Sequence, residues 1–390
     1  MKKVKKILAL VLALTMILAL AACGSDGKKG PKAAKIGVAL YQDAGAAVTA
    51  VKAYLGSLSE KLNVEFAYTV LTQTDEAANL TKIQELIAAG CDGIICTMDM
   101  SMEAILDECK AANVYLAGYL ADYDTSYNNS YDKVFKNEYF LGTVADGGCA
   151  DELKRGYDFF DSLIEYNDAH PDAPIRHVAC CTFPVFAFPY QQTFVAQFQE
   201  KIDAYNAANP DKAITVDPLD SETDILFFKP MDSTYFTKHD GIDAIMSFCA
   251  GSFVYPSMVS AGKQNTLKLF AAGYNDGDNA VFGSKGAYQQ EIVCGVESIT
   301  YPLVLLLNKI NGVEFSDQPD VAERRSCSTF IINSDEDIAL FEKSIYLTGK
   351  AEDALLTPDD VYNLTAFGNE NATYAGLCEV LNHMTIDDLK

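Results

Sequence analysis

Cys23 is the residue whose surroundings point most directly to chemistry. Four lysines near the start of the chain are followed by an unbroken apolar run, Ile7 to Leu20, and then by small residues directly before the thiol. The apolar run is too short to span a bilayer in the mature protein, whereas a basic start, a short apolar stretch and small residues are typical of an export signal. The pattern predicts a signal segment over residues 1–22, with Cys23 as the first mature residue.

This arrangement resembles a bacterial lipoprotein signal, in which the cysteine is diacylated. The resemblance implies an exported protein that is anchored by lipid to the outer face of the cell membrane. Residues 23–34 have no apolar periodicity and are expected to form a flexible tether. Two alternatives are a chance cysteine after an ordinary cleaved signal and a signal that is kept as a membrane anchor.

Ten further cysteines lie along the chain, and none of them forms a C-x-x-C pair. Several stand inside apolar runs that are typical of strands, where a thiol behaves as a small hydrophobic group. Buried free thiols are therefore expected, ahead of disulfides and of metal binding. The ten are Cys91, Cys96, Cys109, Cys149, Cys180, Cys181, Cys249, Cys294, Cys327 and Cys378.

Catalytic patterns are scarce in this sequence. It contains no H-E-x-x-H, no G-x-S-x-G, no phosphate-binding G-x-x-x-x-G-K and no G-x-G-x-x-G, and its four histidines are scattered. We therefore expect a binding protein without enzymatic activity, cofactor or metal. A pair of carboxylates of the glycosidase type stays open, because acidic residues are abundant.

The charge balance narrows the class of partner. The chain has 30 basic and 54 acidic residues, a net charge of −24, and without the four lysines of residues 1–22 the balance is 26 minus 54, or −28. Such a field repels nucleic acid and favours neutral or cationic small molecules. The remaining 368 residues (390 minus 22) are enough for two domains at about 150 residues each.

Strands alternate with helices from residue 35 onward. An alternating run over 36–41 precedes a helix whose apolar residues are spaced 4, 3 and 4 apart, and the same step recurs over 64–90 and 93–117. Parallel strands joined by helices predict an α/β fold with sheets covered on both faces. A polar, tyrosine-rich interval over 122–131 marks a lobe boundary, and a long helix is expected around 139–166.

The order of segments resembles type I periplasmic binding proteins, especially the sugar-binding branch. The resemblance covers about residues 35–333 and depends on four segments: KIGVAL at 35–40, IQELIAAGCDGII at 83–95, DGIDAI at 240–245 and AGYND at 272–276. It implies two Rossmann-like lobes that are joined by a three-segment hinge. Lobe 1 would hold 35–121 plus 298–328, and lobe 2 would hold 122–297 plus 329–390, with the C-terminal extension packed on lobe 2.

The same resemblance implies a function. The expected protein is a monomeric solute receptor that binds a small sugar, polyol or nucleoside between its lobes and delivers it to an ABC permease. A receptor for a sensor kinase or chemoreceptor is one alternative, and a surface enzyme acting on glycans is another of a different class.

Open α/β sheets bind ligands at the carboxyl ends of their strands, so the loops after the strands are the candidate site. Sugars stack on aromatic rings and take paired hydrogen bonds from carboxylates and amides. In the first lobe, these loops or strand ends hold Tyr41, Gln42, Asp43, Asp99 and Tyr119.

In the second lobe, an aromatic run over 183–190 is a candidate stacking platform. An arginine is expected early in the next helix of the sugar-binding branch, but glutamines stand there, so the specificity departs from that of a simple pentose or hexose receptor. The second-lobe and hinge candidates are Phe183, Phe186, Gln192, Asn275, Asp276 and Glu297.

Overall fold

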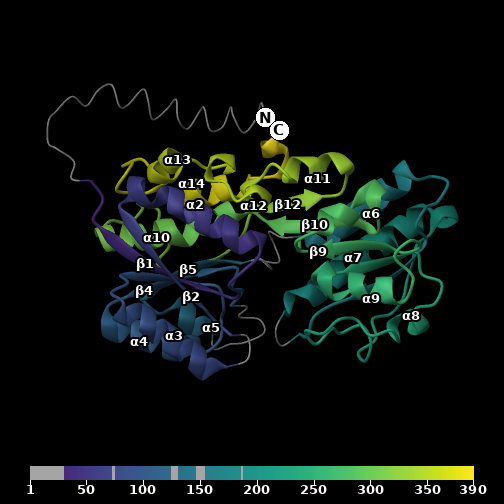
Figure 1. Cartoon of the computed structure of the whole chain (residues 1–390), viewed down its shortest axis with the longest axis horizontal. Helices are drawn as coiled ribbons and strands as arrows, with labels where there is room; N and C mark the ends of the chain where they lie inside the picture. The colour runs from purple at the N-terminus through teal and green to yellow at the C-terminus, as the bar shows by residue number, and fades with distance from the viewer. Residues whose placement is uncertain (1–29, 73–74, 124–130, 146–153, 186–187) are drawn as a thin grey trace. The chain divides into compact units, whose positions relative to one another are not determined.

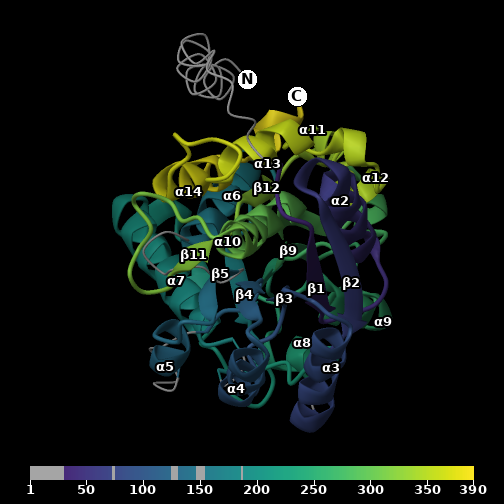
Figure 2. The ribbon, with the colours of Figure 1, turned by 90° about the vertical axis from the view of Figure 1, so that its left-hand side faces the viewer.

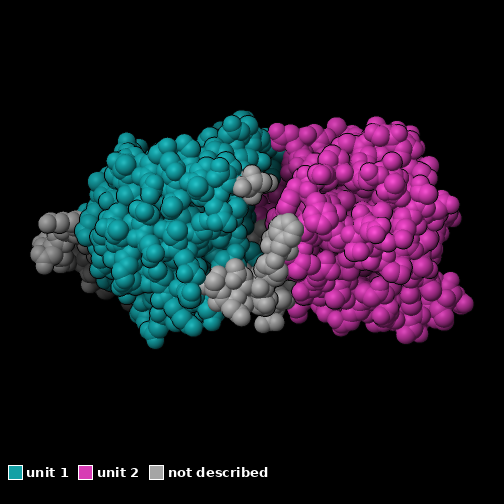
Figure 3. Space-filling model, turned by 90° about the horizontal axis from the view of Figure 1, so that it is seen from below, with its two compact units in different colours: residues 1–146, 295–328, 342–390 teal, residues 147–294, 329–341 magenta. Residues whose placement is uncertain are grey.

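A computed structural model describes residues 30–72, 75–123, 131–145, 154–185 and 188–390. The predicted signal, Cys23, Phe186 and Cys149 lie outside these residues. The chain divides into two compact units: unit 1 holds residues 1–146, 295–328 and 342–390, and unit 2 holds residues 147–294 and 329–341 (Figure 3). Within the described ranges, no helix is both long enough and apolar enough to cross a membrane.

Unit 1 is built on a parallel sheet of six strands in the order β11-β5-β4-β3-β1-β2. Helices α3, α4 and α5 lie on one face of this sheet, and α2 and α10 lie on the other (Figure 2). The strands are β1 (Ala34–Leu40), β2 (Val64–Val70), β3 (Gly93–Cys96), β4 (Tyr115–Tyr119), β5 (Phe140–Ala145) and β11 (Arg324–Ser326). The helices are α2 (Ala46–Leu62), α3 (Glu76–Ala88), α4 (Met102–Ala112), α5 (Tyr131–Phe135), α10 (Thr300–Asn311), α12 (Ile345–Thr348), α13 (Pro358–Leu364) and α14 (Tyr374–Asn382).

Unit 2 contains a second sheet of six strands in the order β12-β10-β9-β8-β6-β7, in which only the β12–β10 pair is antiparallel. The strands are β6 (His177–Cys181), β7 (Thr215–Val216), β8 (Ala244–Ser247), β9 (Lys268–Ala272), β10 (Tyr288–Cys294) and β12 (Thr329–Ile332). The helices are α6 (Arg155–Ala169), α7 (Tyr190–Ala208), α8 (Tyr235–Lys238), α9 (Tyr255–Ser260) and α11 (Asp335–Phe341) (Figure 1). The predicted α/β fold class is confirmed.

Local sequence explains these elements well. In α2, the predicted apolar residues Val51, Leu55, Leu58 and Leu62 are all buried, and the helix ends at Asn63 in the left-handed conformation that asparagine tolerates. Helix α3 begins at Asp75, whose carboxylate accepts a hydrogen bond from the Ala78 amide at 2.9 Å. In unit 2, α6 and α7 pack together on the sheet through Phe159, Leu163, Phe194 and Phe198.

The division of the chain differs from the expected one at the first boundary. Residues 122–146 belong to unit 1, because β5 pairs with β4 and β11 inside its sheet. The predicted long helix over 139–166 is therefore wrong: its first part is strand β5, and α6 begins only at Arg155. Aromatic and β-branched residues such as Phe140 and Val144 suit either element, and pairing between strands decides between them.

The C-terminal extension also lies elsewhere than expected. Residues 342–390 pack on unit 1, over α2 and α10, rather than on lobe 2 (Figure 2). The Asn308 side chain accepts a hydrogen bond from the Ala366 amide at 2.9 Å, and the hydroxyls of Tyr301 and Tyr374 lie 2.8 Å apart. Helix α10 is apolar around most of its surface, so its outer side would expose apolar residues to water without the C-terminal extension.

The cysteines follow the expectation in part. Seven are buried and form no disulfide: Cys91, Cys96, Cys109, Cys180, Cys181, Cys249 and Cys378. Cys294 and Cys327 are disulfide-bonded, which corrects the expectation of free thiols for these two. Each stands at or just beyond the end of a strand, where only the folded chain decides which sulfur atoms meet.

Candidate functional site

The carboxyl edge of the unit 1 sheet brings most of its candidates together. Strands β1 and β3 are parallel neighbours, with Ala39 opposite Cys96, so the loops that start at Tyr41 and Thr97 leave the sheet side by side. Tyr41, Gln42 and Asp43 follow β1, and all three are at least partly exposed. They are therefore positioned where a ligand at this edge would meet a ring and two polar groups.

Asp99 lies in the loop after β3 and is partly buried. The hydroxyl of Tyr131 donates a hydrogen bond to its carboxylate at 3.0 Å. Burial raises the pKa of Asp99, and the hydrogen bond from Tyr131 opposes that shift. Tyr119 differs from the other candidates, because it is the last residue of β4 and is only 3% exposed.

Unit 2 gathers phenylalanine rings after β6. The ring of Phe183 lies 5.2 Å from that of Phe188, 5.1 Å from that of Phe228 and 5.0 Å from that of Phe253, measured between centroids. These four residues are hereafter the aromatic cluster. Phe228 is 41% exposed, so the cluster presents part of one ring to solvent. Phe186, the other predicted ring, lies outside the described residues.

Sequence reasoning missed most of this cluster. Phe228 and Phe253 are far from Phe183 along the chain, and the segment around Phe228 has no clean periodicity. Phe228 has a backbone φ of 55°, an unfavourable conformation for a bulky residue. Such a conformation persists only where surrounding contacts hold the segment in place, and it is common at ligand sites.

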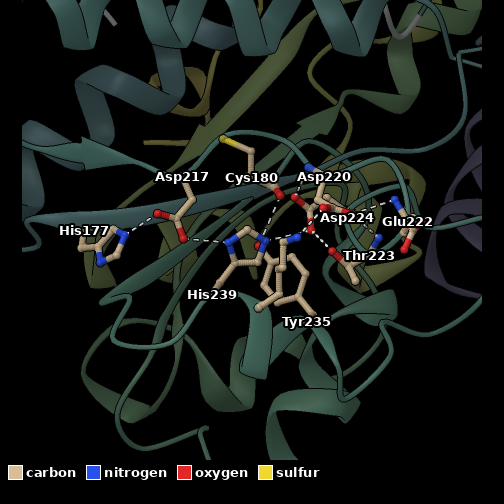
Figure 4. A network of polar contacts seen from close by, with 10 residues as sticks. His177, Cys180, Asp217, Asp220, Glu222, Thr223, Asp224, Tyr235 and His239 are labelled. Carbon is tan, nitrogen blue, oxygen red and sulfur yellow. Dashed lines mark hydrogen bonds and ion pairs between the residues drawn. The ribbon is translucent and has the colours of Figure 1, made fainter.

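A network of polar contacts holds the segment that carries Phe228 (Figure 4). The carboxylate of Asp217 lies 2.6 Å from the Nε2 atom of His177 and 2.7 Å from the Nδ1 atom of His239. The Nε2 atom of His239 lies 2.9 Å from the buried carboxylate of Asp224. Both ring nitrogens of His239 therefore face carboxylates.

The network is continuous with the end of β6. The Thr182 amide donates to the Asp224 carbonyl at 3.0 Å, and the Leu226 amide donates back to the Thr182 carbonyl at 2.8 Å. Phe228 is thus fixed two residues beyond a backbone anchor, close to Phe183. Across the described parts of the chain, no group of three or more His, Cys, Asp or Glu side chains is arranged to hold a metal ion.

Two carboxylates of this region, those of Asp217 and Asp220, are stabilised in their charged form. Burial raises the pKa of Asp217, but hydrogen bonds to His177 and His239 outweigh it, and the net shift is downward. The ammonium of Lys238, 2.7 Å from the carboxylate of Asp220, lowers the pKa of Asp220 to about 2, with help from backbone amides.

The remaining unit 2 candidates occupy two loops. Gln192 lies in the first turn of α7, where its Nε2 atom donates to the Thr182 hydroxyl at 3.3 Å, beside the aromatic cluster. Asn275 and Asp276 follow β9. Asn275 donates to the carboxylate of Asp278 through its backbone amide at 2.9 Å and its side chain at 3.2 Å, and Asp276 is exposed.

Glu297 belongs to unit 1, in a short 3₁₀ helix, Val296–Ile299, that precedes α10. It is buried, and its carboxylate accepts a hydrogen bond from the Leu355 amide of the C-terminal extension at 3.0 Å. Burial raises the pKa of Glu297, and the hydrogen bond from Leu355 opposes that shift. No local sequence pattern around Glu297 predicts its contact with Leu355, which is 58 residues away along the chain.

No protein-family model matches this chain, and no curated protein is similar to it in sequence. Among solved structures, the chain is similar to the periplasmic binding protein component of the arabinose ABC transporter from Shewanella sp. ANA-3, bound to alpha and beta-L-arabinofuranose. The identity is 14%, the TM-score is 0.54, and the match covers 79% of this chain and 95% of that chain. The chain has the type I periplasmic binding-protein fold.

Two further solved structures share the type I fold. GanP, a glucose-galactose binding protein from Geobacillus stearothermophilus, has 14% identity and a TM-score of 0.51, over 77% of this chain and 98% of that chain. The 5-methylthioribose transporter solute binding protein from Thermotoga lettingae TMO has 10% identity and a TM-score of 0.52, over 91% of this chain and 98% of that chain. The type I fold places the candidate residues but assigns no ligand by itself.

Proposed function

We propose that this protein is an exported solute-binding lipoprotein of an ABC importer that captures a small, sugar-like ligand. The observation that carries the proposal is the chemistry at the carboxyl edges of its two sheets. One edge carries Tyr41, Gln42, Asp43 and Asp99, and the other carries the aromatic cluster and the polar loop after β9. A ring platform and convergent polar groups are what a carbohydrate requires.

The proposed mechanism is closure of two lobes around the ligand. A ligand that contacts both lobes stabilises the closed form, so binding shifts the population toward the conformation that a permease would recognise. Lipid on Cys23 and the tether over 23–34 would keep the monomeric receptor at the outer face of the membrane, near that permease. The high negative charge argues against nucleic acid as a partner.

A thermal-shift screen of the purified chain tests this proposal. The panel contains pentoses, hexoses, polyols, sugar acids and nucleosides, and the bound compound is then recovered and identified. A ligand at 100 times its dissociation constant is expected to stabilise the fold by about 2.7 kcal/mol. Recovery of an unchanged compound separates the receptor from a glycan-acting enzyme, and a panel without any stabilising compound would count against the proposal.

A further inference from the structure

Two cysteine side chains meet between neighbouring strands of unit 2. Cys181 is the last residue of β6, and Cys249 lies two residues beyond the end of β8. The two strands are parallel neighbours, with Cys181 opposite Ser247. The sulfur atoms of Cys181 and Cys249 lie 3.9 Å apart, and the Ser247 hydroxyl oxygen lies 3.4 Å from the first sulfur and 3.3 Å from the second. Two thiols that are far apart along the chain therefore form one pair.

Cys180, the residue before Cys181, points to the other face of β6, because successive residues of a strand alternate between the two faces of a sheet. It belongs to the core cluster that contains Phe159 of α6 and Phe198 of α7. Cys181 and Cys249 are also buried, but they are not members of that cluster. Cys180 is thus an equally buried thiol on the opposite face, and it provides a matched control for the pair.

A disulfide between Cys181 and Cys249 requires only a small movement. An S–S bond is about 2.0 Å long, so the two sulfur atoms, now 3.9 Å apart, have to approach by about 2 Å. Cys249 lies beyond the end of β8, where the chain can adjust while the strands stay paired. Cys294 and Cys327 are disulfide-bonded, and disulfides form and persist in oxidising compartments, which is the setting expected for an exported chain.

From this geometry we infer that Cys181 and Cys249 are a redox pair, present here as two thiols, which a disulfide donor such as oxidised glutathione converts into a disulfide. The thiolate of one cysteine attacks a sulfur atom of the donor and displaces one glutathione thiolate. The other cysteine then attacks the mixed disulfide and displaces the second glutathione. The bond between the two cysteine sulfurs forms as the S–S bond of the donor breaks. The two cysteines lose two electrons and two protons, which the two released glutathiones take up.

The bond would join the two loops that supply the aromatic cluster. Phe183 lies two residues after Cys181, Phe253 lies four residues after Cys249, and the centroids of the two rings are 5.0 Å apart. A covalent connection at the base of both loops limits how far these rings can separate, and it removes conformations from the unfolded chain. The inference goes beyond the proposed function, because it does not depend on the ligand.

Peptide mapping of the purified full-length chain tests the inference. The protein is unfolded and reduced, refolded in a buffer of oxidised and reduced glutathione so that the thiols react before they are buried, treated with iodoacetamide and digested with trypsin. Trypsin releases Cys180 and Cys181 in the peptide 177–201, and Cys249 in the peptide 239–263. We expect these two peptides to be linked and to separate on reduction. Cys181→Ser should abolish the link, and Cys180→Ser should retain it.

Cys294 and Cys327 are the internal control, because both must be oxidised in the same sample. Circular dichroism verifies that each variant is folded. The Tm gives a second readout: the increase on oxidation should be at least about 4 °C larger in Cys180→Ser than in Cys181→Ser. Alkylated Cys181 and Cys249 in a sample with oxidised Cys294 and Cys327, or a link that survives Cys181→Ser, would overturn the redox pair. Equal increases in Tm would overturn its stabilising effect.

Discussion

At the residue scale, Phe228 is the most informative side chain of the candidate site. It combines an unfavourable backbone conformation, partial exposure and contact with Phe183, and it lies two residues beyond the anchor to Thr182. A residue that only filled the core would gain nothing from this conformation. We therefore propose that this segment presents the exposed face of the Phe228 ring to a ligand.

Replacement of Phe228 by Ala should weaken ligand binding by about three- to tenfold, the usual contribution of one aromatic contact. Titration of the ligand found in the screen measures the change. Phe227→Ala is the matched control, because Phe227 is 55% exposed and is not part of the aromatic cluster. If both variants bind like the wild type, the aromatic cluster is not part of the site.

The acid sensitivity of folding should reflect the network around His239. Asp217 and Asp220 have pKa values below the usual range, so each contributes stability above its unfolded pKa and loses it as the pH falls through the folded pKa. The free energy of unfolding should therefore decrease between about pH 4 and pH 2. Urea denaturation across this range measures it, and Asp220→Asn should flatten part of the slope. An unchanged slope in that variant would mean that the pair with Lys238 is absent in solution.

At the element scale, the close approach of α6 and α7 depends on one glycine. A Cβ atom at Gly156 would lie 2.1 Å from the Phe194 carbonyl oxygen, which is backbone and cannot turn away. The same pair of helices covers the unit 2 sheet through Phe159 and Phe198. Their separation would therefore open the core of this unit.

We predict that Gly156→Ala destabilises the fold by about 1–3 kcal/mol, since overpacking forces the helices apart. Gly56→Ala in α2 is the matched control, because a Cβ atom there meets nothing within 4 Å. That change should stabilise the protein by about 0.5–1 kcal/mol through lower chain entropy. Chemical denaturation measures the free energy of unfolding of both variants, and equal values for the two would disprove the close packing.

At the scale of the whole molecule, the two units each have a complete sheet and a core of their own, with residues after 328 returning first to unit 2 and then to unit 1. Separate cores connected by several chain segments permit rigid-body motion without unfolding. The proposed mechanism uses this freedom for ligand capture.

Small-angle scattering should record a smaller radius of gyration at saturating ligand than in its absence. In the proposed mechanism, a ligand contacts both lobes only in the closed form. A sugar that fails to bind in the screen serves as the control compound. Superimposable curves with a ligand that titration shows to be bound would rule out closure as the capture mechanism.

The α/β class and the first three strand–helix steps could be predicted from the sequence, because they depend on local periodicity. Val51, Leu55 and Leu58 face the core simply because their spacing places them on one side of a helix. The loop after β1 was predictable for the same reason, since the strand itself locates it.

The tertiary structure alone decided which distant segments meet. Phe228 joins Phe183, and the C-terminal extension covers α10 of unit 1, although neither pair is close along the chain. Polar loops and aromatic turns carry no periodic signal, and their positions depend on strand pairing and on contacts formed only after both units fold. For this reason the sequence by itself determined the class of fold and the sheet edges that hold the candidate residues, whereas tertiary contacts decided which side chains meet there.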